Sequence, residues 1–308
     1  MNGKTQAKIS GVLNVDKPLG PTSYDVVRIV KRLSGQRKVG HTGTLDPMAT
    51  GVLLLCLGKA TRVVQYLMSS PKTYEAEVRL GISTATHDAE GEITGRAEVQ
   101  VAREDVLAAL GQFVGPIEQV PPMHSAIKHD GKRLYQLARQ GVNLQIPPRK
   151  VDIYTLELLE WVPPFVRLSI SCGPGTYIRA LARDLGTALG CGGYLSALRR
   201  TRSGQFSVEE AVTLQDLEKA FVTGTGEALL HSLDVAFADL PAFYVGLEEA
   251  RRLAMGQQLD AGRGPEGRRE ARVYAPDREF VAVVRRDEQT GCWLPHHVFV
   301  TPEDLSYS

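Results

Sequence analysis

The spacing of hydrophobic residues divides the chain into short helices and strands. Apolar positions three and four residues apart, as on one face of a helix, recur in residues 22–33, 60–68, 103–115, 133–140, 175–190 and 247–259. Strand-like hydrophobic runs occupy residues 11–18, 52–57, 73–81, 150–160, 165–172, 272–275, 280–286 and 293–300. Because the two kinds of element intermix without strict strand–helix–strand alternation, the pattern predicts an α+β fold built on a mixed sheet.

Local signals predict the ends and the buried faces of several of these elements. Thr22 is a suitable N-cap for the first helix, because Asp25 follows three residues later. Residues 52–57, "VLLLCL", predict a strand that is buried on both faces. The strand at 73–81 alternates cleanly, with one face formed by Tyr74, Ala76, Val78 and Leu80. The helix that follows Gly175 is expected to be capped by Thr176 and to point inward Ile178, Leu181, Ala182 and Leu185.

The length and the change in pattern along the chain predict two domains. At 308 residues the chain exceeds what one hydrophobic core usually holds together. Residues 1–238 contain the mixed helices and strands, and residues 239–308 form a compact, mostly β appendage. The boundary is therefore placed near residue 238.

The composition, the lengths of the apolar runs and the cysteine spacing limit the classes of protein that the sequence fits. The hydrophobic content of 43 % and the charged content of 23 % are ordinary for a globular protein. No apolar run approaches the roughly 20 residues of a membrane span, and the N-terminus has no secretory signal. The four cysteines lie far apart without a CxxC pair, which favours reduced thiols in a cytoplasmic protein over a disulfide framework or a zinc ribbon.

Basic residues are concentrated in parts of the chain although the net charge is only +1. Residues 1–40 carry eight Lys and Arg against two Asp, and residues 128–150 carry six against one. Residues 167–202 repeat the ratio of six to one, whereas residues 203–250 hold nine acids and one base. Basic stretches that fold onto one face would bind a polyanion such as nucleic acid, and the alternative is solvated surface spread over all faces.

The stretch "VGHTGTLDPMATGVLLLCLG", residues 39–58, places Asp46 in a loop of small residues before a buried strand. An Asp before a Pro is often only a turn residue. Two features favour chemistry instead: the glycines allow a substrate to approach closely, and the following strand makes a rigid support. No second acid lies nearby with the spacing of a glycosidase pair, so a single Asp acting as nucleophile is the sharper hypothesis.

The segment "GTYIRALARDLG", residues 175–186, is the second candidate. Arg179, in the first turn of the predicted helix, is placed to pair with a carboxylate and to hold it ionised, whereas Arg183 is interpreted as a solvated surface residue. The sequence contains no HExxH, GxxxxGK[ST] or GxGxxG motif. We therefore expect neither a metal site nor a nucleotide cofactor.

Five motifs resemble one family in their order along the chain. They are "LNVDKPLGPTS" (13–23), "GHTGTLDPMATGVL" (40–53), "KTYEAEVRLG" (72–81), "PPMHSAIKHDGKRLYQLARQG" (121–141) and "GTYIRALARDLG" (175–186). They look like the motifs of the bacterial TruB family of tRNA pseudouridine synthases, which modify the T-arm uridine (the Psi55 type). Residues from "LEEARRLAMGQQL" onward resemble the C-terminal PUA domain of that family.

The resemblance implies roles for individual residues. Asp46 matches the catalytic aspartate, which attacks C1′ of the ribose or C6 of the base, or assists a glycal route. Arg179 matches the arginine that pairs with that carboxylate. Tyr74 matches the tyrosine that stacks on the target base and removes its C5 proton. The family's chemistry needs no cofactor.

The resemblance also implies how tRNA is bound. Tyr177 and Leu198 match residues that complete the base pocket, and His41 matches the histidine that fills the space left by the flipped uridine. The implied phosphate contacts come from an RNA-gripping insertion at about 120–150 and from Lys17, Lys128, Lys132 and Arg133. Two positions depart from the family pattern: His124 stands where Tyr is common, and Ala85 where Asp is frequent. Both bear on RNA contacts and not on the reaction class.

Three other functions compete with this reading. The first is a homologue that works inside a guide-RNA particle, which the basic insertion at 128–150 disfavours because guided relatives have a reduced one. The second is an RNA-binding or RNA-folding protein without catalysis, which the presence of Asp46, Tyr74 and Arg179 disfavours. The third is a hydrolase that uses Asp46. It is disfavoured because the sequence shows neither a second catalytic acid nor a set of metal ligands. We expect a monomer that needs no protein partner, with an accessory tRNA-folding role left open.

Overall fold

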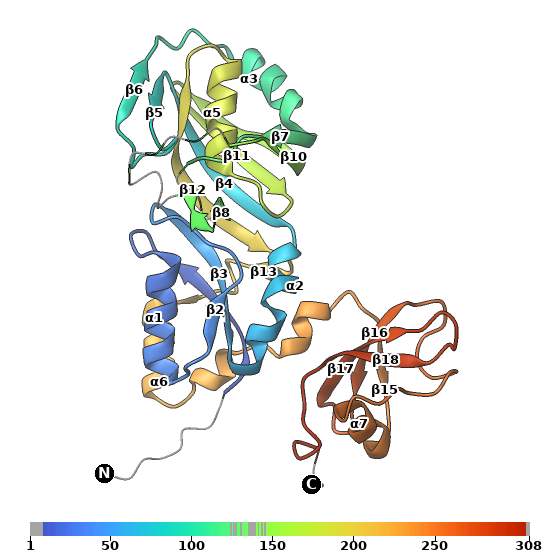
Figure 1. The fold of residues 1–308 in the computed structure, drawn as a ribbon. Helices are drawn as coiled ribbons and strands as arrows, with labels where there is room; N and C mark the ends of the chain where they lie inside the picture. Colours follow the sequence, from blue (N-terminus) through green and yellow to red (C-terminus); the bar gives the residue numbers. More distant parts are fainter. Residues whose placement is uncertain are drawn as a thin grey trace.

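Two sheets organise the protein. The computed structural model describes residues 9–305 except 124, 126–127, 130, 135–139, 141, 143 and 145. A large mixed sheet with helices occupies most of the chain, and a small sheet follows near the C-terminus (Figure 1). Among the described residues, no helix is both long enough and apolar enough to span a membrane.

The large sheet is built from strands spread over much of the sequence. Its members are β1 (Gly11–Lys17), β2 (Val39–His41), β3 (Ala49–Leu57), β4 (Lys72–Leu80), β7 (Gly115–Gln119), β10 (Arg149–Val162), β11 (Phe165–Cys172), β12 (Gly193–Ser203), β13 (Phe206–Ser207) and β14 (Val212–Thr213). The order is β14-β1-β3-β12-β4-β11-β10-β7, with β2 paired to β3 and β13 paired to β12. The β1–β14 and β3–β12 pairs are parallel and the other pairs are antiparallel, which confirms the predicted mixed sheet.

Helices and two small hairpins complete this part of the chain. The α-helices are α1 (Ser23–Ser34), α2 (Val64–Ser69), α3 (Arg103–Leu110), α5 (Ile178–Ala188) and α6 (Leu214–Val222). The 3-10 turns are η1 (Gly58–Val63), η2 (Gly111–Phe113), η3 (Gly226–Leu229) and η4 (Leu233–Phe237). The hairpins are β5 (Ile82–Thr84) with β6 (Ile93–Arg96), and β8 (Lys128–His129) with β9 (Lys132–Arg133).

Strand β3 is buried on both faces because it separates two hydrophobic cores. Leu53, Leu55 and Leu57 pack into the main core, which the inward faces of α1, α3 and α5 cover. The alternate residues Val52, Leu54 and Cys56 pack into a second core with η1, α2 and the C-terminal sheet. Because successive side chains of a strand point to opposite faces, β3 contributes residues to both cores. This confirms the prediction that residues 52–57 are buried on both faces.

The predicted helix signals are confirmed at α1 and wrong in one detail at α5. Thr22 caps α1 and forms a capping box with Asp25. At α5 the N-cap is Tyr177, which makes no side-chain capping bond. The Thr176 hydroxyl instead donates to the carbonyl of Gly173, 2.9 Å away, in the turn before the helix. The four α5 residues expected to point inward are buried: Ile178, Leu181, Ala182 and Leu185.

Several strands were not predicted from the sequence. The central strand β12, "GYLSALRRTRS", carries three arginines and has no simple hydrophobic alternation, yet it joins β3 to β4. The β5–β6 hairpin and nearly all of β7 lie in segments for which neither a helix nor a strand was predicted. The helix predicted at 133–140 lies largely outside the described residues.

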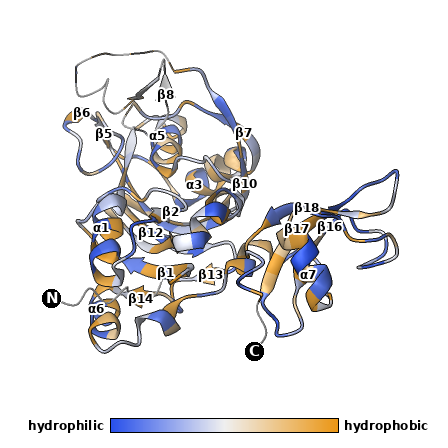
Figure 2. Ribbon diagram, turned by 60° about the horizontal axis from the view of Figure 1, so that its bottom comes forward, coloured by the Kyte–Doolittle hydropathy of each residue, from blue (hydrophilic) through white to orange (hydrophobic). Residues whose placement is uncertain are grey.

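The C-terminal sheet has a core of its own. Its strands are β15 (Ala242–Tyr244), β16 (Glu270–Tyr274), β17 (Phe280–Arg286) and β18 (Trp293–Val298), in that order across the sheet, and helix α7 (Leu247–Ala254) packs on it. Helices α1 and α7 carry hydrophobic and hydrophilic residues on different sides (Figure 2). Aromatic contacts join the small sheet to the rest of the chain through η4, where the Phe237 ring lies 6.0 Å from Phe280 and 4.7 Å from Tyr66 of α2.

Candidate active site

The loop between β2 and β3 holds Asp46 in a fixed position. The hydroxyl of Ser23, at the start of α1, accepts the Leu45 amide at 2.8 Å and donates to the Leu45 carbonyl at 2.9 Å. The Gly20 amide donates to the Pro47 carbonyl at 3.0 Å. Because the residues on both sides of Asp46 are held by the segment before α1, the direction of its carboxylate is set by the fold.

Lys17 is part of this brace and not an RNA contact, which contradicts the sequence-based expectation. Its side chain is fully buried, and its ammonium donates to the carbonyls of Pro18, Pro47 and Ala49 at 2.9, 3.3 and 2.7 Å. Burial lowers the pKa of Lys17 to about 8, against the attraction of Asp46. A lysine enclosed in this way cannot reach a phosphate, so it serves to tie β1 to the loop of Asp46.

Arg179 lies between two carboxylates. Its Nε is 3.0 Å from Oδ2 of Asp46, and its Nη2 donates to Oδ1 of the same carboxylate at 3.4 Å. Its Nη1 is 3.1 Å from Oδ2 of Asp88. The side chains of Arg179 and Asp88 are 7 % and 4 % exposed, whereas that of Asp46 is 33 % exposed. Asp46 is therefore the member of the trio that a substrate can reach.

Asp88 is held by the turn between β5 and β6. Its Oδ1 accepts hydrogen bonds from the Thr86 hydroxyl and from the Glu90 amide. His87, between them, has a φ of 62°, a left-handed conformation that is uncommon for a residue other than glycine. The turn therefore directs one oxygen of Asp88 at its own backbone and the other at Arg179.

Burial raises the pKa of the Asp46 carboxyl above its ordinary value. The negative charge of Asp88 adds to the rise, while Arg179 and Lys17 act in the opposite direction. A carboxylate with an elevated pKa binds a proton more strongly and is a better base and nucleophile than a solvated one. Arg179 keeps this carboxylate oriented by a two-point contact.

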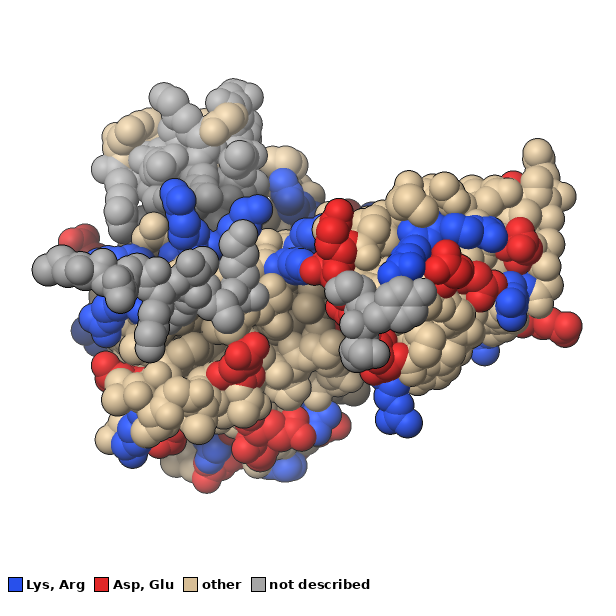
Figure 3. All heavy atoms as spheres, turned by 90° about the horizontal axis from the view of Figure 1, so that it is seen from below, with Lys and Arg blue, Asp and Glu red and all other residues tan. Residues whose placement is uncertain are grey.

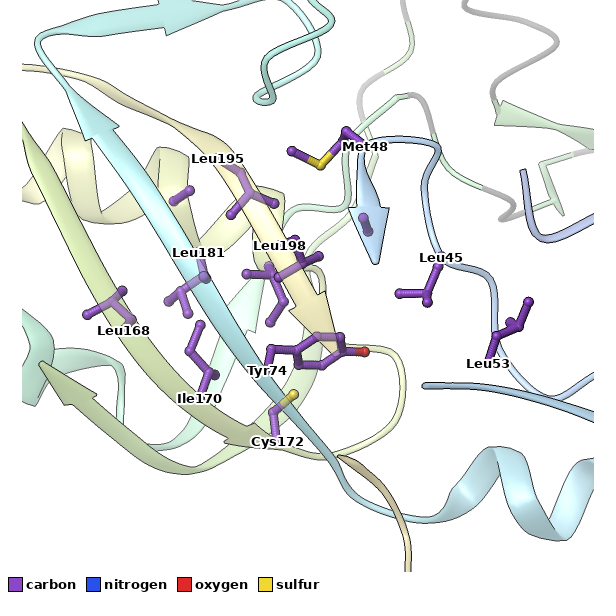
Figure 4. Packing of buried hydrophobic residues seen from close by; sticks show 14 of the residues in the cluster. Leu45, Met48, Leu53, Tyr74, Leu168, Ile170, Cys172, Leu181, Leu195 and Leu198 are labelled. Carbon is purple, nitrogen blue, oxygen red and sulfur yellow. The ribbon is translucent and has the colours of Figure 1, made fainter. Parts of the chain in front are cut away.

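Tyr74 lies at the N-terminal end of β4, close to the core. It is 9 % exposed, and its ring lies between Leu198 and Cys172 with the hydroxyl on the side of Leu45 (Figure 4). Burial raises the pKa of its phenol, and the positive charge of Arg200 opposes that rise. The tyrosine is thus a fixed aromatic wall with a polar end.

Two other predicted site residues lie on elements that border this group. The Tyr177 amide donates to Oε1 of the buried Gln119 at 3.0 Å, and Nε2 of Gln119 donates back to the Tyr177 carbonyl at 3.4 Å. Burial raises the pKa of the Tyr177 phenol. His41 ends β2 in a half-buried position, and its Nδ1 accepts the amide of Gly43 at 3.3 Å.

Leu198 is brought to the same region by β12. It is 9 % exposed and pairs with Ala49 of β3 and Ala76 of β4, next to the Tyr74 ring in Figure 4. The backbones of the basic residues predicted to bind RNA form the β8–β9 hairpin, and their side chains lie outside the described part: Lys128, Lys132 and Arg133. His124 also lies outside it.

No group of three His, Cys, Asp or Glu side chains in the described part of the chain is placed to hold a metal ion. The chemistry available from these residues is that of an oriented carboxylate, an arginine and a tyrosine. The role of Asp88 in "THDAEG" could not be predicted from the sequence, because its partner Arg179 is 91 residues away along the chain.

The chain matches family models and known proteins over most of its length. The model for the N-terminal domain of TruB family pseudouridylate synthases matches residues 31–178, and that for the tRNA pseudouridylate synthase B C-terminal domain matches residues 179–237. The "tRNA pseudouridine synthase B" of Dehalococcoides mccartyi (strain BAV1) is 45 % identical over 295 residues, 95 % of this chain and 97 % of that protein. The protein of that name from Ralstonia pickettii is 47 % identical over 270 residues, 86 % of this chain and 85 % of that protein.

Solved structures show the same fold. A chain of a Cbf5-Nop10-Gar1 complex superposes with a TM-score of 0.73 at 27 % identity, covering 100 % of this chain and 90 % of that one. A chain of an H/ACA RNP bound to a substrate RNA containing 2′-deoxyuridine has a TM-score of 0.71 at 26 % identity, with 98 % and 93 % covered. Fold and site together define a pseudouridylate synthase. Within that class, the chain belongs to the TruB family.

Proposed function

We propose that this pseudouridine synthase acts on tRNA as a stand-alone enzyme and isomerises the uridine of the T loop. The TruB family membership and the names of the relatives support the substrate and the reaction. The observation that carries the proposal is the Asp46 carboxylate, which is partly exposed and held at two points by Arg179. We propose no metal, cofactor or guide RNA.

Asp46 is the reagent in this proposal. Attack at C1′ of the ribose, attack at C6 of the base and assistance of a glycal route each need an ionised carboxylate beside the glycosidic bond. Arg179 supplies the counter-charge and the orientation, and Asp88 holds Arg179 from the protected side. The reaction breaks the N1–C1′ bond and forms a C5–C1′ bond, so the product has the composition of the substrate.

The target uridine must leave the folded arm to reach Asp46, at a cost of a few kcal/mol. In our proposal Tyr74 stacks on the flipped base, and Leu198 and Tyr177 close the pocket around it. His41 occupies the space that the uridine leaves. The positions of Tyr74 and Leu198 on neighbouring strands, next to each other in Figure 4, support a shared pocket.

RNA binding is assigned to surfaces outside the pocket. We propose that Lys128, Lys132 and Arg133, in the insertion at about 120–150, hold the phosphates of the T arm, and that a PUA-like domain at 239–308 extends the contact. A separate hydrophobic core beginning at Val245 and the end of the family match at residue 237 support that boundary. Figure 3 shows a group of Lys and Arg side chains toward the top of one face, which suits a polyanion.

We further propose a cytoplasmic monomer that needs no protein partner. The four cysteines are free, as expected for a reducing compartment, and three of them are buried. The guided alternative is tested by the same experiment as the main proposal, because a stand-alone enzyme converts its substrate with no other macromolecule present.

The experiment uses purified protein and an unmodified T-arm stem-loop, without added metal or nucleotide. Pseudouridine is mapped by position for the wild type and for Asp46→Asn, with Asp216→Asn as a matched control on an exposed carboxylate of α6. We expect conversion of one T-loop uridine by the wild type and the control, and none by Asp46→Asn. Binding without conversion by the wild type would move the function to a guided or RNA-folding role.

A further inference from the structure

Arg200 is a buried arginine directly behind the proposed base pocket. The residue is 3 % exposed and pairs with Tyr74 across the β4–β12 ladder. Its Nε donates to the carbonyl of Val52 at 2.6 Å, and its Nη2 donates to the carbonyl of Gly43 at 3.2 Å. Gly43 belongs to the loop that carries Asp46. One side chain therefore connects β12, the strand paired with that of Tyr74, to β3 and to the loop of Asp46.

The charge of Arg200 has no acidic partner among the described residues. Within the part of the chain that the structure describes, no carboxylate forms an ion pair with it. A buried charge without an opposite charge is costly, and neutral carbonyl acceptors compensate for it only in part. A hydrophobic residue would stabilise a strand at this position with no such cost. Charges that a fold does not need for its stability are concentrated at functional sites.

Two more buried cations surround the same region. Lys72 is 6 % exposed and donates to the carbonyls of Met68 and Ser70, each at 2.5 Å, and Lys17 is fully buried. Burial and, to a smaller extent, the charge of Arg200 together lower the pKa of both lysines to about 8. Three cations that repel one another thus lie around the phenol and the catalytic loop, where they favour negative charge.

We propose that Arg200 is a positioning residue for Tyr74: it fixes the phenol relative to the Asp46 loop and stabilises the phenolate that removes the C5 proton. This inference rests on the proposed function and assigns a role to a residue that the sequence analysis did not single out. Arg200 acts through Tyr74 and makes no contact with the substrate in this account.

The groups that face Tyr74 support this role. Burial raises the pKa of the phenol, and Cys172 from β11 and Asp46 from the catalytic loop raise it further. Arg200 from β12 lowers it, through its charge and through a hydrogen bond. Without Arg200, the ionised form of Tyr74 would lose its one source of stabilisation among these neighbours.

The proton transfer balances as follows. After the C5–C1′ bond has formed, C5 carries both the ribose and its hydrogen. The Tyr74 phenolate takes that proton, and the electron pair of the C5–H bond forms the C5=C6 double bond of the product. At the same time the π pair of the C6=N1 bond moves onto N1 or, after attack at C6, the pair of the C6–O bond returns to Asp46. N1, released from the ribose, takes a proton from solvent, and Tyr74 returns its proton to solvent.

The test compares Arg200→Met and Arg200→Lys with the wild type in single-turnover conversion of the T-arm stem-loop between pH 6 and 10. Arg199→Met is the matched control, because its side chain is 42 % exposed and pairs with Asp16 at 2.9 Å. We expect Arg200→Met to be about 100-fold slower, the effect of losing one preorganised donor. Arg200→Lys should recover at least about tenfold of that loss, because it restores the charge. The RNA Kd and the far-UV spectrum should stay the same, and the rate of Arg199→Met should match that of the wild type.

A second comparison separates this role from simple loss of structure. In a Tyr74→Phe background, Arg200→Met should cost little more, because the hydroxyl through which Arg200 acts is already gone. Tyr74→Phe could have no measurable turnover, or Arg200→Met could fail to fold. In either case the rate of Arg200→Lys and its pH profile at alkaline pH test whether Arg200 acts through Tyr74. Equal loss in both Arg200 variants, full additivity with Tyr74→Phe, or an unchanged pH profile overturns the inference. An inactive wild type overturns the proposed function instead.

Discussion

The active site and the C-terminal sheet both contain arginine–carboxylate pairs, but the two environments give them different roles. Arg179 pairs with Asp46 and Asp88 while only 7 % of its side chain is exposed. Arg285 pairs with Glu270 across β16 and β17 at 2.8 Å, with 57 % and 34 % of the two side chains exposed. Similar nitrogen–oxygen distances are therefore found in a buried network in one region and in a solvated surface pair in the other.

The comparison shows that burial, and not distance, decides what such a pair does. Exposed pairs contribute on the order of 1 kcal/mol or less to stability. A buried network is costly to form, and breaking one member leaves an uncompensated charge. Asp88 and Arg179 thus form a buried ion pair that neither can leave without a large cost. Asp46 is the accessible carboxylate of the three residues.

The largest expected effect is loss of turnover in Asp46→Asn. The amide retains the shape of the carboxylate but can act neither as nucleophile nor as base, so conversion should fall by at least about 10⁴-fold. RNA binding, measured by filter retention, should stay within about threefold of wild type. Retained turnover in Asp46→Asn would show that the buried network has no more bearing on the reaction than the surface pair of the C-terminal sheet.

Asp88→Asn should have the next largest effect. It leaves Arg179 buried with one carboxylate instead of two, which should lower the free energy of unfolding by on the order of 3 kcal/mol. The single-turnover rate should fall about 100-fold, because Arg179 is less firmly oriented. Denaturant titration and quench kinetics give the two values. A change of neither would show that Asp88 is dispensable.

The pH dependence should reveal the environment of Asp46. Its carboxyl has a pKa above the ordinary value of 3.8, so the active, ionised form is lost as the pH falls through that higher pKa. The acid limb of kcat/KM should therefore lie above the pH at which an exposed aspartate titrates. Because the charge of Asp88 adds to the rise, the limb should move to lower pH in Asp88→Asn. A limb at the same pH in both proteins would contradict the proposed coupling.

The smallest effect is expected for Glu270→Gln in the C-terminal sheet. The pair with Arg285 is partly solvated, so the free energy of unfolding should change by less than about 1 kcal/mol, and the rate of conversion should not change. Thermal unfolding in low and high salt provides the measurement. A loss as large as that of Asp88→Asn would remove the contrast between the two regions.

Sequence predicted the elements whose pattern is local. The capped start of α1 and the doubly buried β3 follow from short-range signals and hydrophobic spacing. Strand β12 could not be predicted in this way, because Arg199 is paired and Arg200 is buried only once the neighbouring strands lie beside it. Lys17 was assigned to a phosphate contact by the family resemblance, whereas in the structure its ammonium donates to the carbonyls of Pro47 and Ala49 beside Asp46.

The candidate site followed a similar division. Asp46 stood out in its loop, and the partnership with Arg179 was implied by the family resemblance and is present in the structure at 3.0 Å. The contribution of Asp88 depends on a contact across 91 positions of the chain, which one sequence without homologues cannot reveal. Gln119, which orients Tyr177 from 58 positions away, escaped notice for the same reason.

The most direct test of the account measures single-turnover conversion of one T-arm RNA by the wild type, Asp88→Asn and Asp46→Asn, with RNA binding measured in parallel. The account predicts equal binding, a reduced but measurable rate for Asp88→Asn and no conversion by Asp46→Asn. Conversion by Asp46→Asn at a rate equal to or above that of Asp88→Asn would contradict the assignment of Asp46 as the reagent.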